Sequence, residues 1–325
     1  MKKIITILFF SFSILYAKSA SAPWGFWAHQ RINHMALFTL PQELFAFYKP
    51  HADYIAEHAV DPDKRRYAVE GEAPKHYIDL THFGTYPFSA LPHKWNDAII
   101  KYPEDTLQAY GIVPWHIERM MFWLSDAMKA KDANKILKTT AELGHYIADA
   151  HVPLHCNENY NGQLTNQHGI HAFWESRIPE LLGEKYDYVV GTAEYIPDIN
   201  KKIWDIVLMS NLMSDTVLNF EAQLNTEFPA DRKYSYETRG QTTVRTYSKE
   251  YTLTYNTLID NMVERRMRET IINLGSFWFT AWINAGKPDL SGITLKPWTE
   301  EELKEMQEVD ASYKSGDKIK GRVEE

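Results

Sequence analysis

Apolar side chains recur at intervals of three and four residues along most of the chain, the spacing that places them on one face of an α-helix. In residues 117–131 this face consists of Met120, Met121, Leu124, Ala127 and Met128, and in residues 136–150 of Ile136, Leu137, Leu143, Tyr146 and Ile147. Further helices are predicted over residues 196–228 and 242–285, and glycine and proline residues from 286 to 292 mark the end of the last one. No strand-rich block or internal repeat stands out. The pattern therefore predicts an all-α protein.

The two ends of the chain depart from this pattern. Lys2 and Lys3 precede an apolar run over residues 4–16 and a small, polar stretch over 17–22, which is typical of an export signal. The run is short for a membrane span, so a cleaved signal peptide over residues 1–22 is preferred to an uncleaved anchor. We expect one domain over 23–290 and a charged tail over 291–325, with a short helix and a frayed terminus. The mature protein is expected to be periplasmic or secreted.

Composition and charge narrow the function. With 325 residues, of which 44% are hydrophobic, the chain can bury a large core. A net charge of -8 argues against a broad basic surface for duplex nucleic acid, but it leaves open a phosphate site built on metal ions. Arg65 and Arg66 are interpreted as a solvated charge pair. Cys156 is the only cysteine, so an intramolecular disulfide is excluded, and stability must come from packing and bound metal.

Two helical signatures carry the candidate chemistry. They are His145-x-x-x-Asp149 and His171-x-x-x-Glu175, and His155 lies between them. Residues four apart on a helix project from one face, so each pair can direct an imidazole nitrogen and a carboxylate oxygen to one point. The proline two residues before His155 is expected to end the first helix and turn His155 back toward it. Together these features predict a metallohydrolase with clustered divalent ions.

Four segments also carry a resemblance to a known family. They are WGFWAH (24–29), KHYIDL (75–80), GHYIADAHVPLH (144–155) and HGIHAFWES (168–176). Together they resemble the superfamily of zinc-dependent phospholipase C and the single-strand-specific nucleases of fungi and plants. The motifs run from Trp24 to Glu175, an interval of about half of the chain. The resemblance implies a single multi-helix all-α domain of the phospholipase C/single-strand nuclease type, with three zinc ions in a cleft.

The resemblance implies ligands for the first zinc one residue at a time. His76, His145, Asp149 and an upstream aspartate would hold it, and Asp149 would bridge to the third zinc. Asp61 and Asp63 are both candidates for the upstream ligand, and Asp61 is preferred from its distance to His76. The preferred residue would also be the catalytic one, because it would orient the attacking hydroxide and accept its proton.

The resemblance also implies the ligands of the other two ions. His155, His171 and Glu175 would hold the second zinc, which would stabilise the departing oxygen. The third would take His29 together with the amino and carbonyl groups of an N-terminal Trp24. A free amino group there requires cleavage directly before the tryptophan, whereas the small residues at positions 20 and 22 favour earlier cleavage. In that case Trp24 is an aromatic anchor and the third ion is held differently.

The reaction expected of such a centre is phosphodiester hydrolysis, because zinc lowers the pKa of bound water to about 7 and clamps phosphoryl oxygens. Single-stranded DNA or RNA is slightly preferred as substrate, because the interval from Trp24 to His29 is short, as in the nuclease branch, and because Tyr77 and Asp79 stand where that branch places an aromatic and an acid near the base. A phospholipid is the alternative, which Glu175 in place of an aspartate and the compact spacing of the second zinc's histidines favour. Two interpretations of Tyr77 stand side by side: it is an aromatic residue of the core, or it is a platform on which a base stacks. No stable protein partner is implied.

A different class of protein also fits a buried zinc cluster, namely a non-catalytic exported module that keeps metal for its structure. Such a module is expected to have an interrupted ligand set. The principal set is complete in this sequence, so hydrolysis is the preferred interpretation. Zinc content measured together with phosphodiesterase activity separates the two.

Overall fold

The computed structural model describes residues 25–239 and 242–322. The predicted signal peptide over 1–22 and the predicted ligand Trp24 lie outside the described residues. Within them the protein is helical apart from one two-stranded antiparallel hairpin, which confirms the all-α prediction. None of the helices in this part of the chain has the length and apolarity needed to cross a membrane.

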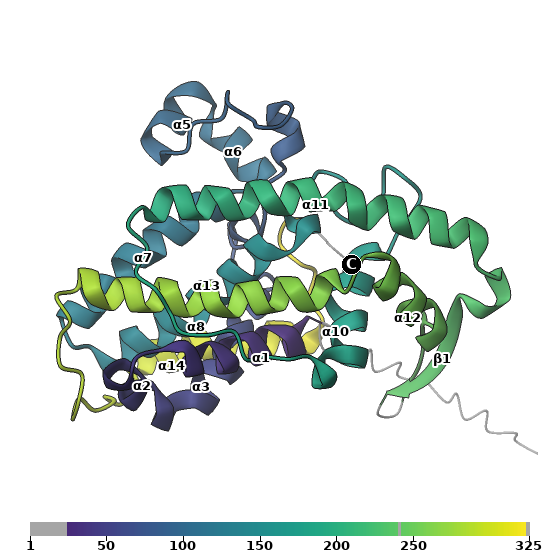
Figure 1. Ribbon diagram of the computed structural model, residues 1–325. Helices are drawn as coiled ribbons and strands as arrows, with labels where there is room; N and C mark the ends of the chain where they lie inside the picture. The colour runs from purple at the N-terminus through teal and green to yellow at the C-terminus, as the bar shows by residue number, and fades with distance from the viewer. Residues whose placement is uncertain (1–24, 240–241, 323–325) are drawn as a thin grey trace, which may run out of the picture.

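The elements follow one another along the chain as a series of short helices, a long helical core and a C-terminal helix (Figure 1). The helices are α1 (Phe26–Ala36), α2 (Gln42–Tyr48), α3 (Ala52–Glu57), α4 (Asp61–Arg65), α5 (Trp95–Lys101), α6 (Glu104–Tyr110), α7 (Val113–Lys129), α8 (Ala133–His151), α9 (Ile170–Ala172), α10 (Ile178–Leu182), α11 (Ile199–Glu227), α12 (Lys249–Leu258), α13 (Met262–Asn284) and α14 (Glu300–Ser315). The strands are β1 (Tyr234–Arg239) and β2 (Thr242–Tyr247).

Helix α8 lies at the centre of the fold. It begins where the Asp132 side chain accepts a hydrogen bond from the backbone amide of Lys135, which satisfies one of the free amides of the first turn. Helices α1, α3, α7, α11 and α13 all pack against it, and Figure 1 shows α8 running beneath α13 and beside α1. The predicted helices over 117–131, 136–150 and 196–228 correspond to α7, α8 and α11. The segment with the first histidine–aspartate pair is therefore held on several sides.

The buried apolar side chains form one connected cluster with members between Ala28 and Leu290. Aromatic residues supply much of its volume, because the largest fully buried side chains include two tryptophans and several tyrosines. These are Trp204, Trp278, Tyr48, Tyr146, Tyr251 and Tyr255. The core thus extends across the helices that carry the candidate ligands.

The prediction of one helix over residues 242–285 is wrong in its first part. Thr242–Tyr247 forms β2 and pairs with Tyr234–Arg239. The run Thr-Thr-Val-Arg-Thr-Tyr is rich in β-branched and aromatic residues, which favour strands. Ser248 then caps α12 by accepting a hydrogen bond from a backbone amide, and Asn261, with a positive φ of 51°, separates α12 from α13.

The charged tail also differs from its prediction. Helix α14 starts in a capping box in which Thr299 and Glu302 each accept a hydrogen bond from the other's backbone amide. The chain does not fray after it within the described residues. Instead the Lys320 amide donates a 2.7 Å hydrogen bond to the carbonyl of Arg66, which returns residues 320–322 to the body of the protein.

Candidate metal centre

A proline-induced turn places His155 beside the C-terminal end of α8. The helix ends at His151, and Val152 is extended, at φ −79° and ψ 121°, because it precedes a proline. The turn Pro153–Cys156 then carries His155, as predicted. Its backbone carbonyl accepts a 2.8 Å hydrogen bond from the amide of Ile78, which ties the turn to the segment that contains the KHYIDL motif.

The structure gathers the predicted ligands that it describes, except Asp61, in three adjoining groups of side chains. In each group the candidate ligand atoms lie within 4.8 Å of one another. The groups are His29, His145 and Asp149; Asp63, His76 and His145; and His155, His171 and Glu175. They come from four stretches of the chain that are far apart in sequence, so only the fold brings them together. The three groups therefore outline a common buried centre.

Asp149 connects the three groups. Its Oδ2 atom lies 3.0 Å from Nδ1 of His76 and 3.2 Å from Nε2 of His145. Its Oδ1 atom lies 3.4 Å from Nε2 of His29 and 3.9 Å from Nε2 of His155. The carboxylate is 1% exposed. An aspartate whose two oxygens face different pairs of histidines has the geometry to coordinate two ions at once.

The third group joins two helical segments through Glu175. Its Oε2 atom lies 2.8 Å from Nε2 of His171 and 3.2 Å from Nε2 of His155. Glu175 belongs to a π-helical turn, Phe173–Arg177, of the kind that is frequent at functional sites. Gly25 approaches the same carboxylate, because a methyl group on this glycine would come 2.5 Å from Oε1. A side chain on Gly25 would therefore have to displace the Glu175 carboxylate from its place.

The aspartate that belongs to the second group is Asp63 and not Asp61. Its Oδ1 atom lies 3.7 Å from Nε2 of His145 and 3.8 Å from Nδ1 of His76. Asp61 points elsewhere, because its carboxylate accepts a 2.9 Å hydrogen bond from Lys64 and lines a separate cavity of about 210 Å³ beside α14. Residues two apart on a helix lie on different faces, so the two aspartates cannot both reach the histidines. The geometry therefore favours Asp63 over Asp61 at this position, and the choice of ligand stays a prediction.

Backbone carbonyls fix the orientation of two imidazoles. Nδ1 of His145 lies 2.9 Å from the carbonyl of Ala59, and Nδ1 of His171 lies 3.1 Å from that of Tyr160. Because a carbonyl only accepts, each Nδ1 carries a proton, and Nε2 is the nitrogen that each ring turns toward the centre. This is the arrangement by which metal-binding histidines are commonly oriented.

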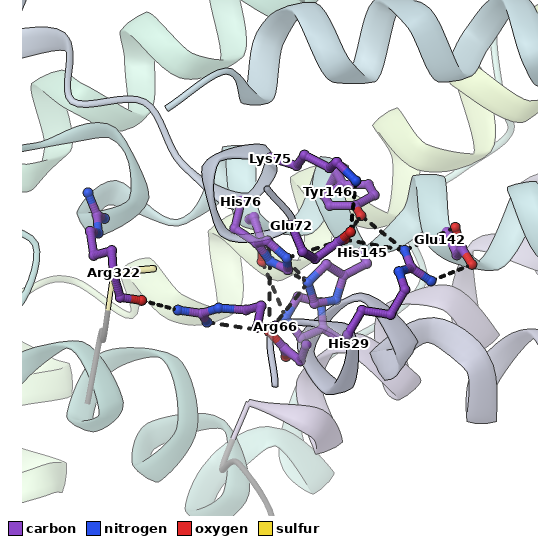
Figure 2. Close-up of polar contacts among 12 residues, drawn as sticks. His29, Arg66, Glu72, Lys75, His76, Glu142, His145, Tyr146 and Arg322 are labelled. Atoms are coloured by element: carbon purple, nitrogen blue, oxygen red, sulfur yellow. Dashed lines mark hydrogen bonds and ion pairs between the residues drawn. The ribbon is translucent and has the colours of Figure 1, made fainter. Parts of the chain in front are cut away.

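Glu72 supports the centre from behind His76. Its Oε1 atom lies 3.7 Å from Nε2 of His76, and its carboxylate receives hydrogen bonds from Lys75, Arg65 and Tyr146 (Figure 2). Burial alone would raise the pKa of Glu72, but His76 and Arg65 outweigh it and hold the pKa well below its usual range. Glu72 is therefore a buried anion. Sequence reasoning missed it, although its spacing of four from His76 was visible.

The two neighbouring arginines are not a solvated pair, which corrects that interpretation. Arg65 donates a 2.7 Å hydrogen bond to Glu142 and is mostly buried. Arg66 is 8% exposed, and its Nη1 atom lies 3.7 Å from Asp63. Arg66 therefore lies beside the centre, whereas Arg65 binds the carboxylate of Glu72 behind it.

The electrostatics of the centre favour bound cations. Burial lowers the pKa of His29, and His145 lowers it further. Burial would also lower the pKa of His145, but the carboxylates of Asp149 and Asp63 outweigh it and raise the pKa to about 9. Burial would raise the pKa of Asp149 and of Glu175, yet the surrounding histidines hold both well below the usual range. Without metal, the buried carboxylates thus draw protons onto an imidazole.

Tyr77 and Asp79, the predicted substrate contacts, lie beside the centre and are 3% and 5% exposed. The Tyr77 hydroxyl donates a 3.2 Å hydrogen bond to the carbonyl of Ala109, which fixes the ring. Asp79 accepts a 2.6 Å hydrogen bond from Arg322. A further aromatic residue, Tyr160, faces the same guanidinium and was not found from the sequence.

The buried histidine and carboxylate groups could hold a metal ion, because they offer nitrogen and oxygen ligands from one shared pocket. No protein-family model matches this chain, and no curated protein matches it. The case for the centre therefore comes from the placement of its own side chains.

Proposed function

We propose that this protein is an exported zinc-dependent phosphodiesterase, of the type formed by phospholipase C and the single-strand-specific nucleases, with single-stranded nucleic acid as substrate. The observation that carries the proposal is the junction of three ligand groups at Asp149. Mixed imidazole and carboxylate sets suit zinc, and adjoining sets suit a centre with more than one ion. When bound, zinc supplies a water of lowered pKa and a clamp for phosphoryl oxygens.

Asp63 is assigned the role that the resemblance implied for Asp61. Its side chain is 15% exposed, more than that of Asp149, and its carboxylate stands at the edge of the centre. A carboxylate that reaches both solvent and the reacting group can accept a proton from an attacking water. Arg66, 3.7 Å from this carboxylate, keeps a positive charge where a phosphoryl oxygen would approach.

Nucleic acid is preferred to phospholipid because of the aromatic residues beside the centre. Tyr77 and Tyr160 face one planar group from two sides, at 3.6 and 3.7 Å from their ring centroids. A base that stacks on an aromatic face gains about 1–3 kcal/mol without sequence selectivity. Asp79 at the rim can accept hydrogen bonds from amino groups of a base. The quaternary ammonium of a choline head group would also bind aromatic faces, so nucleic acid is preferred for the planar group that the two rings contact and not for the rings alone.

The test is a substrate panel with a matched histidine control. Purified protein is stripped with chelator, reloaded with zinc, and assayed on single-stranded DNA, RNA, phosphatidylcholine and a chromogenic phosphodiester. We expect cleavage of nucleic acid that chelator abolishes and zinc restores. His145→Ala should abolish turnover, whereas His168→Ala, at an exposed histidine of the HGIH motif, should retain it. Zinc-dependent activity on lipid alone would overturn the substrate assignment, and full zinc occupancy without turnover would overturn hydrolysis.

A further inference from the structure

The C-terminal segment occupies the aromatic site beside the candidate metal centre. The guanidinium carbon of Arg322 lies 3.6 Å from the ring centroid of Tyr77 and 3.7 Å from that of Tyr160. We call these two rings the tyrosine clamp. The Nη1 atom of Arg322 also donates a 2.6 Å hydrogen bond to Oδ1 of Asp79, and its side chain is 9% exposed. The arginine therefore fills the clamp.

Backbone contacts hold the segment in place. The Lys320 amide donates to the carbonyl of Arg66, and the Arg66 guanidinium donates to the carbonyl of Arg322, each at 2.7 Å. Figure 2 shows Arg66 lying between Arg322 and the histidines of the centre. The Lys320 ammonium group adds a 2.7 Å hydrogen bond to the carbonyl of Ala68. Because Arg66 also contacts Asp63, the tail is anchored directly beside a candidate ligand.

Close packing of the segment requires a glycine. Gly321 has a φ of +118°, and a methyl group on it would come 2.7 Å from the side chain of Ala73. An alanine at this position would be strained in conformation and would clash with the helical turn that precedes His76. The site that binds the tail therefore selects for a small residue at position 321 as well as for the positive charge of Arg322.

We propose that residues 320–322 are an intramolecular competitor of the substrate, in which Arg322 takes the place of a nucleobase in the tyrosine clamp. This inference rests on the proposed function and extends it to regulation. A guanidinium and a base are both planar, both stack on aromatic faces, and both offer N–H donors to Asp79. Two planar groups cannot stand between the same rings, so substrate must displace the tail. The protein is therefore self-inhibited until the tail leaves.

The test measures binding rather than turnover. Zinc-loaded full-length protein is titrated with adenosine 5′-monophosphate by calorimetry, with inorganic phosphate as a probe that lacks a base. Arg322→Ala and Gly321→Ala each free the clamp, the first by removing the planar group and the second by displacing the backbone. Lys318→Ala is the matched control, because it removes a positive charge from an exposed position on the same tail.

We expect the nucleotide to bind roughly tenfold more tightly to both clamp variants, the order of one stacking contact. Inorganic phosphate should bind all four proteins alike, and Lys318→Ala should match the wild type. Equal or weaker nucleotide binding by the clamp variants would overturn the inference, as would no nucleotide binding by any of the proteins. If the zinc-loaded wild type cleaves none of the phosphodiester substrates, the proposed function is overturned instead. The failure of the inference and the failure of the proposed function are therefore distinguishable.

Discussion

Gly144 and Asn33 are in such close contact that a methyl group on the glycine would come 2.0 Å from Oδ1 of the asparagine. The Asn33 amide group donates hydrogen bonds to the carbonyls of Ala141, at 2.9 Å, and Ile55, at 3.3 Å. It thereby links α1 to α8 and α3. Since Gly144 directly precedes His145, this contact sets how deeply the ligand-bearing helix lies in the core.

Gly144→Ala should therefore destabilise the protein and weaken its metal site. Overpacking of a buried contact typically costs about 1–3 kcal/mol, and denaturant unfolding would measure it. In the Asn33→Ala background the same substitution should cost much less, because the clashing amide is gone. Equal costs in both backgrounds would show that the contact does not govern the position of α8.

Asp63→Asn should lower kcat on single-stranded DNA by at least about 100-fold, as expected when a metal ligand or proton acceptor is lost. Asp61→Asn is the matched control, two residues away on the same helix. It should keep zinc content and turnover near the wild type, because Asp61 contacts Lys64 and His58 and not the histidines of the centre. A greater loss in the Asp61 variant would reverse the assignment of the two aspartates.

Glu72→Gln should reduce zinc affinity by about 10- to 100-fold, the usual effect of removing a residue that orients a metal-binding histidine. Competition with a calibrated chelator gives the affinity directly. Glu70→Gln, which alters a nearby carboxylate that is 85% exposed, serves as the control. Indistinguishable affinities for the two variants would exclude a supporting role for Glu72.

The metal-free protein should lose thermal stability as the pH rises above neutrality. The pKa of His145 is raised from 6.5 to about 9, so its stabilising proton is fully present below pH 6.5 and is lost as the pH rises through 9. At acid pH the lowered pKa values of Asp149 and Glu175 have the opposite effect on stability. The free energy of unfolding falls as the pH drops below the ordinary pKa values of these groups, 3.8 and 4.5.

Melting temperatures of chelated and zinc-loaded protein between pH 6 and 9 test this. We expect the difference in melting temperature between the two forms to grow with pH, because at higher pH a proton on the His145 imidazole competes less with zinc. A constant difference across the range would indicate that His145 is not protonated in the metal-free form.

The sequence predicted the helical core well, because long amphipathic segments have an unambiguous period. Helices α7, α8 and α11 fall where the apolar spacing placed them, and the proline turn before His155 was read correctly. The hairpin was missed because the six residues of β2 were merged into the apolar pattern of α12 and α13, and a strand that short shows little alternation of its own.

The candidate site was predicted in its sequence-local part and missed where it depends on contacts over long separations. The pairs His145–Asp149 and His171–Glu175 were found from their spacing of four residues, whereas the pair Glu72–His76 was missed at the same spacing. The choice between Asp61 and Asp63 depends on how a five-residue helix is rotated, which spacing alone does not fix. The positions of Tyr160 and Arg322 against Tyr77 depend on how a loop and a distant tail pack, and no local pattern marks them.

The approach of Gly25 to the Glu175 carboxylate has a practical consequence for recombinant work. Any polypeptide fused ahead of this glycine enters the fold beside a candidate zinc ligand. A histidine-rich affinity tag at that point would bring extra imidazoles to the ion and could take over its coordination. Preparations that differ only in how their leading residues were trimmed should therefore differ in metal content, even when their helical bodies are identical.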